Sequence, residues 1–600
     1  MRGGERGEEA IQMLGARLPE VAAHHRRSAA ELRAMLRRDR SLRLDSRGRL
    51  HYLCEGLIAP VVGGQTNLND GPVAALFPLP QTFLLHSKPG ANKKIFLDFD
   101  GHTLSENAWT ANYNGGTNIV APPWDTDGNP GSFSSDEQTA IQQIWFRVAE
   151  DFAGFDVDVT TEFPGEAALT RNGFVDSTYG TRALVSAISS YIGNYGGIAY
   201  VGVFDAIGDY NKPALVFPEK LSNNEKNIAE AISHEVGHNL GLSHDGIAGG
   251  AEYYTGQGNW APIMGVGYSK PIVQWSRGEY ATPSNPENDY TIIGMNGLSF
   301  RADDYGNTTG TASALAGFIS TNFGIIERTN DVDFFSFQTG GGAAELTITP
   351  WERGANVHFL LALYDSTGTL LTNREVADTG SGVQRVTINA ILGAGLHYVS
   401  VEGIGSGNPL TSGYSDYGSL GNYTLTVNLP PASQWLPTAG GNFSWTNPAN
   451  WFSGAVPNSP DAAADLINNI AGDQTITLDA PITISRLILG DTNATHGFTL
   501  TSGGGGGFTL DGSSDVVTIS KMSGTNDLIA ASLVLQDDLS VSNSTAARLT
   551  LAGTISGGQA LTKTGAGLVA LAGTNSYTGD TIISAGTLAL DGTAAFSGAA

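Results

Sequence analysis

Apolar residues recur at two different spacings along the chain, and the change of spacing divides it into regions. The spacing of three or four positions, which predicts amphipathic helices, occurs over residues 9–43, 136–152 and 223–240. Short apolar-rich segments that predict strands occur at 94–99, 155–160, 182–188 and 197–204. The resulting order of strand, helix, strands and helix predicts an α+β domain at residues 89–303.

Beyond residue 303 only β patterns remain. Residues 304–432 alternate over strand-length segments separated by turns, which predicts an antiparallel β-sandwich. Residues 433–600 carry short Thr, Ile, Leu and Val runs between glycine-rich turns. Stacking of such runs predicts a parallel β-solenoid segment, with an irregular β stalk as the alternative. We therefore expect a multidomain chain in which an α+β domain precedes a sandwich and a solenoid.

Charge and composition exclude some classes of function. The formal net charge is -26 and the pI is near 4.7, which argues against nucleic acid as a partner. Residues 1–50 are the exception, with twelve arginines against seven acids. The one cysteine, Cys54, leaves no intramolecular disulfide, and no apolar run is long enough for a transmembrane helix. No secretory signal peptide is visible at the N-terminus.

One stretch concentrates the candidate chemistry, with the pattern H-E-x-x-H-x-x-G-x-x-H-D starting at His234. On a helix, His234 and His238 lie on one face and present two imidazoles to one metal ion. Glu235 beside the first ligand is placed to accept a proton from metal-bound water. Gly241 lets the chain leave the helix and turn, so that His244 returns as the third ligand. Three protein ligands with a fourth position open are typical of catalytic zinc.

This pattern resembles the zinc-binding signature of the metzincin clan of metallopeptidases, and the trailing Asp245 is most similar to reprolysin-type members. The resemblance implies one catalytic Zn²⁺ ion and peptide-bond hydrolysis by zinc-activated water, with Glu235 as general base and Asp245 as support near the third ligand. Metzincins also place a methionine turn beneath the metal, and Met264 in A-P-I-M-G fits that position. Astacins and serralysins have a tyrosine two residues after this methionine. Here Val266 stands there and Tyr268 follows later, so a tyrosine ligand is not expected.

Polypeptide substrates are the partners that the resemblance implies. In metzincins an edge strand of the sheet pairs with extended substrate, a β-augmentation mode. By its order along the chain, the candidate edge strand here is Gly197-Ile198-Ala199-Tyr200. An internal strand would show the same pattern, so both interpretations stay open.

Residues 1–88 are interpreted as a helical pro-region and linker. Arginines on the polar face of these helices suit either a propeptide that covers the active site or an ordinary solvated extension. A thiolate of Cys54 could occupy the open zinc position and hold a zymogen latent, as in the cysteine switch of matrixins. The surrounding Y-L-C-E-G differs from that family's motif, so Cys54 is a weak latency candidate and a buried, inert thiol is the alternative.

A second ion, Ca²⁺, is a weaker expectation. Asp125, Asp127 and Asn129 offer oxygens at alternate positions, with Asp136 in the place of a twelfth-position acid. This resembles a calcium loop, but Pro130 stands where an EF-hand needs glycine. A turn-forming surface loop is the alternative.

The two β regions carry resemblances of their own. Residues 304–432 resemble the bacterial pre-peptidase C-terminal domain through D-V-D-F-F, L-Y-D and G-L-H-Y. Residues 433–600 resemble the autotransporter-associated β-strand repeat through L-T-K-T-G-A-G and N-S-Y-T-G. These resemblances imply an extracellular or cell-surface location, with surface or matrix contact through the β modules or a spacer role. The repeat pattern runs to Ala600 without a cap, so we expect the natural chain to continue.

Together these features predict a secreted zinc metalloendopeptidase. The alternative is a surface adhesin whose metzincin-like domain only recognises polypeptide. Cleavage of a general protein substrate would distinguish the two hypotheses.

Overall fold

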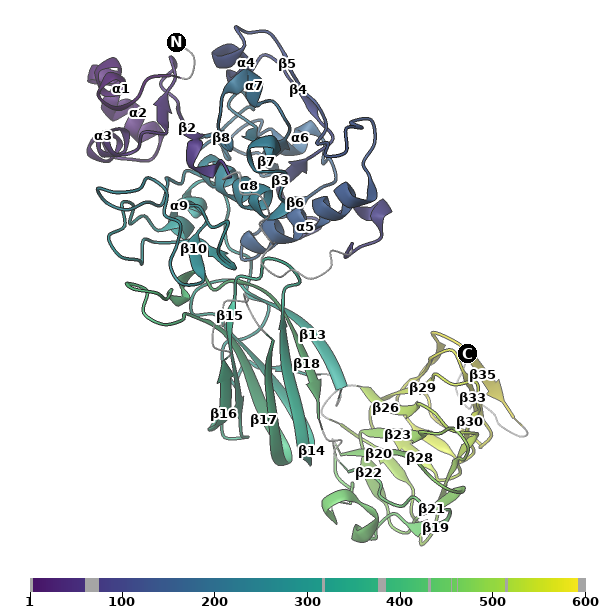
Figure 1. The fold of residues 1–600 in the computed structure, drawn as a ribbon. Helices are drawn as coiled ribbons and strands as arrows, with labels where there is room; N and C mark the ends of the chain where they lie inside the picture. The colour runs from purple at the N-terminus through teal and green to yellow at the C-terminus, as the bar shows by residue number, and fades with distance from the viewer. Residues whose placement is uncertain are drawn as a thin grey trace.

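The computed structural model describes residues 4–59, 75–315, 319–375, 385–429, 433–454, 456–460, 462–512 and 516–591. Figure 1 shows the helices in the N-terminal part of the chain, with two β regions after it. The expected linker at residues 60–74 and the end of the repeat region lie outside the described residues.

The N-terminal α/β region is built on a seven-stranded sheet. In sheet order its strands are β1 (Leu42–Leu44), β2 (Leu50–Cys54), β8 (Gly197–Tyr200), β9 (Ala214–Val216), β7 (Tyr179–Val185), β3 (Lys93–Asp98) and β6 (Asp158–Thr160). The strands from β9 to β6 run parallel, whereas β8 runs antiparallel to both β9 and β2. The segment from β1 to β2 therefore extends a sheet that is otherwise made by residues after 90.

The N-terminal segment that the sequence analysis interprets as a pro-region is not purely helical, which corrects the expectation from its sequence. Its helices are α1 (Gly7–Leu14), α2 (Leu18–His24) and α3 (Ala29–Arg38), and β1 and β2 follow them. All five residues of β2 are buried, so the strand lacks the alternation that marks a half-exposed strand. Its hydrogen-bonding partner β8 lies more than 140 positions away in the sequence, so the local sequence pattern does not predict this pairing.

Two long helices pack against each other and against this sheet: α5 (Ser135–Asp151) and α8 (Glu225–Asn239). A capping box between Ser134 and Glu137 starts α5, and the Asn224 side chain accepts the Asn227 N–H at the start of α8. The smaller elements are α4 (Ala108–Tyr113), α6 (Glu166–Leu169), α7 (Ser189–Ile192), α9 (Asp289–Met295), β4 (His102–Leu104), β5 (Ile119–Ala121), β10 (Trp260–Pro262) and β11 (Ile272–Gln274). None of the helices in the described residues is long and apolar enough to cross a membrane.

The first β region forms one sheet in which every pairing except that of β12 is antiparallel. Its strands are β12 (Ser313–Ala314), β13 (Ile319–Ile326), β14 (Val332–Pro350), β15 (His358–Tyr364), β16 (Leu370–Glu375), β17 (Val386–Ile404) and β18 (Gly421–Asn428). We expected a sandwich of two sheets. Here β14 and β17 stay paired along most of their length, so their continuous hydrogen-bond ladder joins the strands into one sheet. The buried Glu150 of α5 accepts hydrogen bonds from Asn422 of β18, which ties this region to the α/β region.

The second β region consists of three parallel sheets whose strands alternate along the chain. The first contains β19 (Gly441–Ser444), β21 (Gln474–Leu478), β24 (Phe498–Ser502), β27 (Asp527–Ile529), β30 (Leu549–Leu551), β33 (Leu568–Leu571) and β35 (Thr587–Leu590). The second contains β20 (Ala463–Asn468), β23 (Arg486–Asp491), β26 (Val516–Lys521), β29 (Asp538–Asn543), β32 (Leu561–Thr564) and β34 (Thr581–Ile583). The third contains β22 (Ile482–Ile484), β25 (Phe508–Leu510), β28 (Leu533–Leu535) and β31 (Ile555–Gly557). Alternate apolar residues of these strands fill a core separate from that of the α/β region.

Three buried tryptophans anchor the start of this stack, and Trp445 contacts Trp451 at 4.8 Å between ring centroids. We expect Trp445→Ala to lower the local unfolding free energy by about 3–5 kcal/mol, because a large cavity replaces the indole. Native-state hydrogen exchange of the β21 and β24 amides measures this change. Val534→Ala is the control, since Val534 is 37 % exposed. Equal effects of the two substitutions would contradict the assignment of Trp445 to this core.

Candidate metal and catalytic site

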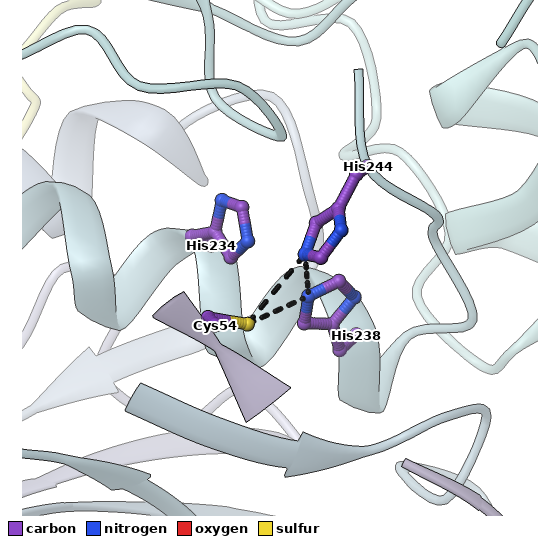
Figure 2. Close-up of side chains that lie close together, drawn as sticks. All are labelled: Cys54, His234, His238 and His244. Carbon is purple, nitrogen blue, oxygen red and sulfur yellow. Dashed lines mark hydrogen bonds between the residues drawn. The ribbon is translucent and has the colours of Figure 1, made fainter. Parts of the chain in front are cut away.

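Three imidazoles converge where α8 ends. His234 and His238 lie one helical turn apart on α8, and Gly241, with φ of +94°, turns the chain so that His244 returns towards them. Nε2 of His238 lies 3.1 Å from Nε2 of His244. Figure 2 shows these rings around one point, together with the side chain of Cys54. One nitrogen of each ring and the Cys54 sulfur all lie within 4.8 Å of one another.

Hydrogen bonds to backbone carbonyls determine which ring nitrogen of His234 and of His238 carries the proton. Nδ1 of His234 donates to the Ile263 carbonyl and Nδ1 of His238 donates to the Leu242 carbonyl, each at 2.9 Å. Each Nε2 therefore carries a lone pair that faces the centre. Burial lowers the pKa of His234 to about 3 and that of His238 well below its ordinary value, so both rings are neutral.

The third ring is held by the pro-region. Nδ1 of His244 lies 3.0 Å from the Asp39 carboxylate, which follows α3 directly. Nε2 of His238 and Nε2 of His244, 3.1 Å apart, are close enough to bind one metal ion together. The donor set of three neutral imidazoles therefore fits Zn²⁺.

Cys54 lies at the same point, at the end of β2. Its sulfur is 3.4 Å from Nε2 of His238 and 3.5 Å from Nε2 of His244. Burial and the neighbouring Glu235 raise the pKa of this thiol well above its usual range, and a hydrogen bond from Tyr253 lowers it in part. The ring of Tyr52 stacks on His238 with 4.1 Å between centroids. The structure thus brings the latency candidate into contact with the metal-site histidines.

Glu235 projects from α8 beside the thiol and is fully buried. Burial raises the pKa of its carboxyl group well above the ordinary value, and contact with the Cys54 thiol opposes this rise. Gly197 of β8 packs so closely that a Cβ there would lie 2.3 Å from Oε1 of Glu235. Glycine at this position therefore gives the carboxyl group its space against β8.

Met264, Asp245 and Tyr268 lie around the histidines and contact the elements that hold them. Met264 is fully buried under α8, where a Cβ on Gly237 would lie 2.6 Å from the methionine sulfur. The Asp245 N–H donates to the Met264 carbonyl at 2.8 Å, and the Asp245 carboxyl accepts the Tyr280 hydroxyl at 3.3 Å. Tyr268 donates its hydroxyl to the Leu57 carbonyl at 2.7 Å, so it contacts the pro-region.

The candidate substrate strand, Gly197–Tyr200, is β8. It pairs with β9 on one side and with β2 on the other, where Cys54 lies opposite Gly197 and His51 opposite Tyr200. Without the pro-region, β8 would be the outermost strand on this side of the sheet. The pro-region therefore takes the place that an added strand would occupy.

The calcium candidate takes a different form from the one expected. Carboxylate oxygens of Asp125, Asp127 and Glu137 lie within 4.8 Å of one another, whereas Asp136 is not part of this group. Asp125 Oδ1 accepts the N–H groups of Gly128 and Asn129, as in an ordinary Asx-type turn. A turn that satisfies its own carboxylate accounts for this loop.

Sequence reasoning missed a second acidic group, at the start of the first β region. Asp303 groups with Asp331 and Asp333, and also with Asp304 and Glu327. Burial and neighbouring acids raise the pKa of Asp333 to about 9 and that of Glu327 to about 10. Such carboxylates are of the kind that hard cations bind. The D-V-D segment, which contains Asp331 and Asp333, is the sequence signal for this acidic group, but its pattern indicates only the β region.

Comparisons with known proteins identify two segments of the chain. Residues 154–245 match the family model of the reprolysin-like metallo-peptidase family M12B, and residues 561–590 match the passenger-associated transport repeat. Both resemblances drawn from the motifs are confirmed. The metallopeptidase domain implies polypeptide substrates, and the repeat indicates a cell-surface or extracellular protein.

The other comparisons add little. No curated protein matches the chain. Among solved structures, the pre-peptidase C-terminal domain of a collagenase from Bacillus anthracis matches with 14% identity and a TM-score of 0.14. The match covers 19% of this chain and 93% of that domain.

The geometry predicts a sulfur ligand on zinc in the full chain. X-ray absorption of the zinc-loaded protein should show one sulfur at about 2.3 Å and nitrogens at about 2.0 Å. Cys54→Ala should remove the sulfur contribution, whereas Met264→Leu, which deletes the other nearby sulfur, should leave it. A wild-type spectrum with only nitrogen and oxygen ligands would contradict the prediction.

Proposed function

We propose that the chain is a secreted zinc-dependent metalloendopeptidase, described here in a latent form. The observation that carries the proposal is the convergence of three buried imidazoles on one point, with the buried Glu235 and strand β8 beside them. The match of residues 154–245 to a metallopeptidase family supports it. A non-catalytic adhesin would have no need for Glu235 beside these ligands.

The residues divide the chemistry between them. A Zn²⁺ ion held by His234, His238 and His244 would supply a Lewis acid for the scissile carbonyl and acidify the attacking water. Glu235 accepts the proton of that water and delivers it to the leaving amine.

Two features of the pro-region make this form latent. The Cys54 sulfur occupies the fourth position around the metal site, and β2 occupies the edge of β8 that extended substrate would pair with. Loss of the thiol alone would leave β2 on β8. Activation therefore requires the whole segment to leave.

The basic pro-region is held to an acidic surface. Arg27 forms an ion pair with Glu287 at 2.6 Å and also donates to the Gly241 carbonyl at 3.1 Å. Arg26 forms an ion pair with Asp205 at 2.7 Å. The excess of arginine in residues 1–50 thus serves docking, while the rest of the chain is strongly acidic.

The C-terminal β regions support an extracellular role. Successive strands of residues 441–590 enter three parallel sheets in turn, which is the arrangement of a β-solenoid. We propose that this segment is a solenoid stalk that brings the peptidase into contact with a cell surface or matrix.

Glu235→Ala should lower the rate of casein hydrolysis by the activated protein about 10²–10⁴-fold, the usual contribution of a general base. Zinc content should stay at one ion per chain, because Glu235 is not among the expected ligands. Glu219→Ala, on an exposed turn of the same domain, is the control. Unchanged hydrolysis by the Glu235 variant would overturn its assigned role.

Activation should need physical release of residues 1–59. A specific protease site introduced within residues 60–74 allows the folded full chain to be cut and the pro-region to be separated by gel filtration. Casein hydrolysis should appear only after separation, and the β8 amides should then lose protection from hydrogen exchange. Cys54→Ala in the uncut chain should restore only a small part of this activity, because β2 remains on β8. Full activity of that uncut variant would contradict the strand-based part of the latency.

A further inference from the structure

We propose that Tyr253 is a further catalytic residue, whose hydroxyl donates a hydrogen bond to the scissile carbonyl oxygen as negative charge develops on it. The inference rests on the metallopeptidase function proposed above. Tyr253 lies outside the H-E-x-x-H signature and precedes Met264, so it differs in place from the tyrosine that follows the methionine turn in astacins and serralysins.

The Cys54 sulfur marks the place where the reacting oxygen would lie. It is within 3.5 Å of two of the imidazole nitrogens, and Cys54 pairs with Gly197, which packs against the carboxyl group of Glu235. A position shared by the metal ligands and the general base is the one that a scissile carbonyl must reach. Groups that contact the sulfur in the latent form are therefore groups that a bound substrate would meet.

Tyr253 supplies a hydrogen-bond donor in the buried cluster around this sulfur. Its ring packs against that of His244, with 4.3 Å between centroids, and its hydroxyl lies 3.1 Å from Ser41 Oγ at the edge of the same cluster. The other members of this cluster are the imidazoles assigned to the metal and Glu235, which acts as the base. A phenol is protonated at neutral pH and can donate to an oxyanion.

The peptidase domain itself holds Tyr253 in place. The next residue, Tyr254, donates its N–H to the Asp245 carbonyl at 2.7 Å and accepts the Val266 N–H at 2.9 Å. Tyr253 is thus fixed between the third histidine and the methionine turn. The Tyr253 ring also packs against His244, with 4.3 Å between centroids. These anchors do not include the pro-region, so they persist when it leaves.

The pro-region covers Tyr253 as well as the metal site. A Cβ on Gly56 would lie 2.3 Å from the Tyr253 ring, so the pro-region backbone passes directly over it. Ser41 of the pro-region contacts the hydroxyl. Departure of residues 1–59 would free the hydroxyl and vacate the sulfur position in one event.

The test uses the folded full chain, cut within residues 60–74 and freed of its pro-region, with Tyr253→Phe compared to the unsubstituted protein. Loss of one oxyanion donor should lower kcat about 10²–10³-fold with little change in KM. Affinity for a phosphinic peptide, which carries tetrahedral oxygens at the reacting position, should fall by a similar factor at unchanged zinc content. Tyr254→Phe is the matched control, because its hydroxyl binds Gln257 Oε1 at 2.9 Å.

The outcomes separate this inference from the function on which it rests. Unchanged kcat and phosphinate affinity in Tyr253→Phe, with hydrolysis still dependent on Glu235, would overturn the role of Tyr253 alone. A rise in KM or a loss of zinc that accounts for the whole defect would assign Tyr253 a structural role and also overturn the inference. Absence of hydrolysis by the released protein with Tyr253 intact would overturn both proposals.

Discussion

The structure of the N-terminal region depends on bringing three buried imidazoles to one point. Burial disfavours the charged form of each ring, so the surrounding chain must hold neutral imidazoles in place. Carbonyls of Ile263 and Leu242 hold the first two rings, and the Asp39 carboxylate lies against the third. The fold supports the site through two main-chain carbonyls and one carboxylate that come from different segments.

Packing around the three histidines is so close that a side chain at either of two glycine positions would collide with its neighbours. Gly237 allows α8 to rest on Met264, and Gly197 allows β8 to approach Glu235. These contacts place Met264 and β8 on opposite sides of one helix. Small displacements at either glycine would therefore move the histidines or Glu235.

The N-terminal segment is part of this architecture, and in the function that we propose it is also the inhibitor. Leu42, Leu50 and Tyr52 belong to the same hydrophobic core as the peptidase helices. The contacts that block β8 thus also stabilise the sheet against solvent. The C-terminal parallel sheets have a separate core, so their stability is independent of the site to a first approximation.

The sequence by itself determined the parts that depend on local spacing. The four-residue interval of His234 and His238 placed two rings on one helical face, and Gly241 predicted the turn towards His244. Alternation predicted strands in both β regions, and the peptidase and repeat families were recognised from their motifs. Local spacing specifies these features because each arises within a few residues.

Only the tertiary structure decided the contacts that join distant segments. The pairing of β2 with β8, the position of Cys54 at the histidines, and the approach of Asp39 to His244 depend on chain closure over long separations. Tyr253 has no pattern of its own in the sequence, because its position comes from backbone hydrogen bonds of the neighbouring Tyr254. Long-range hydrogen bonds and burial determine these arrangements, and the local periodicity of the sequence does not predict them.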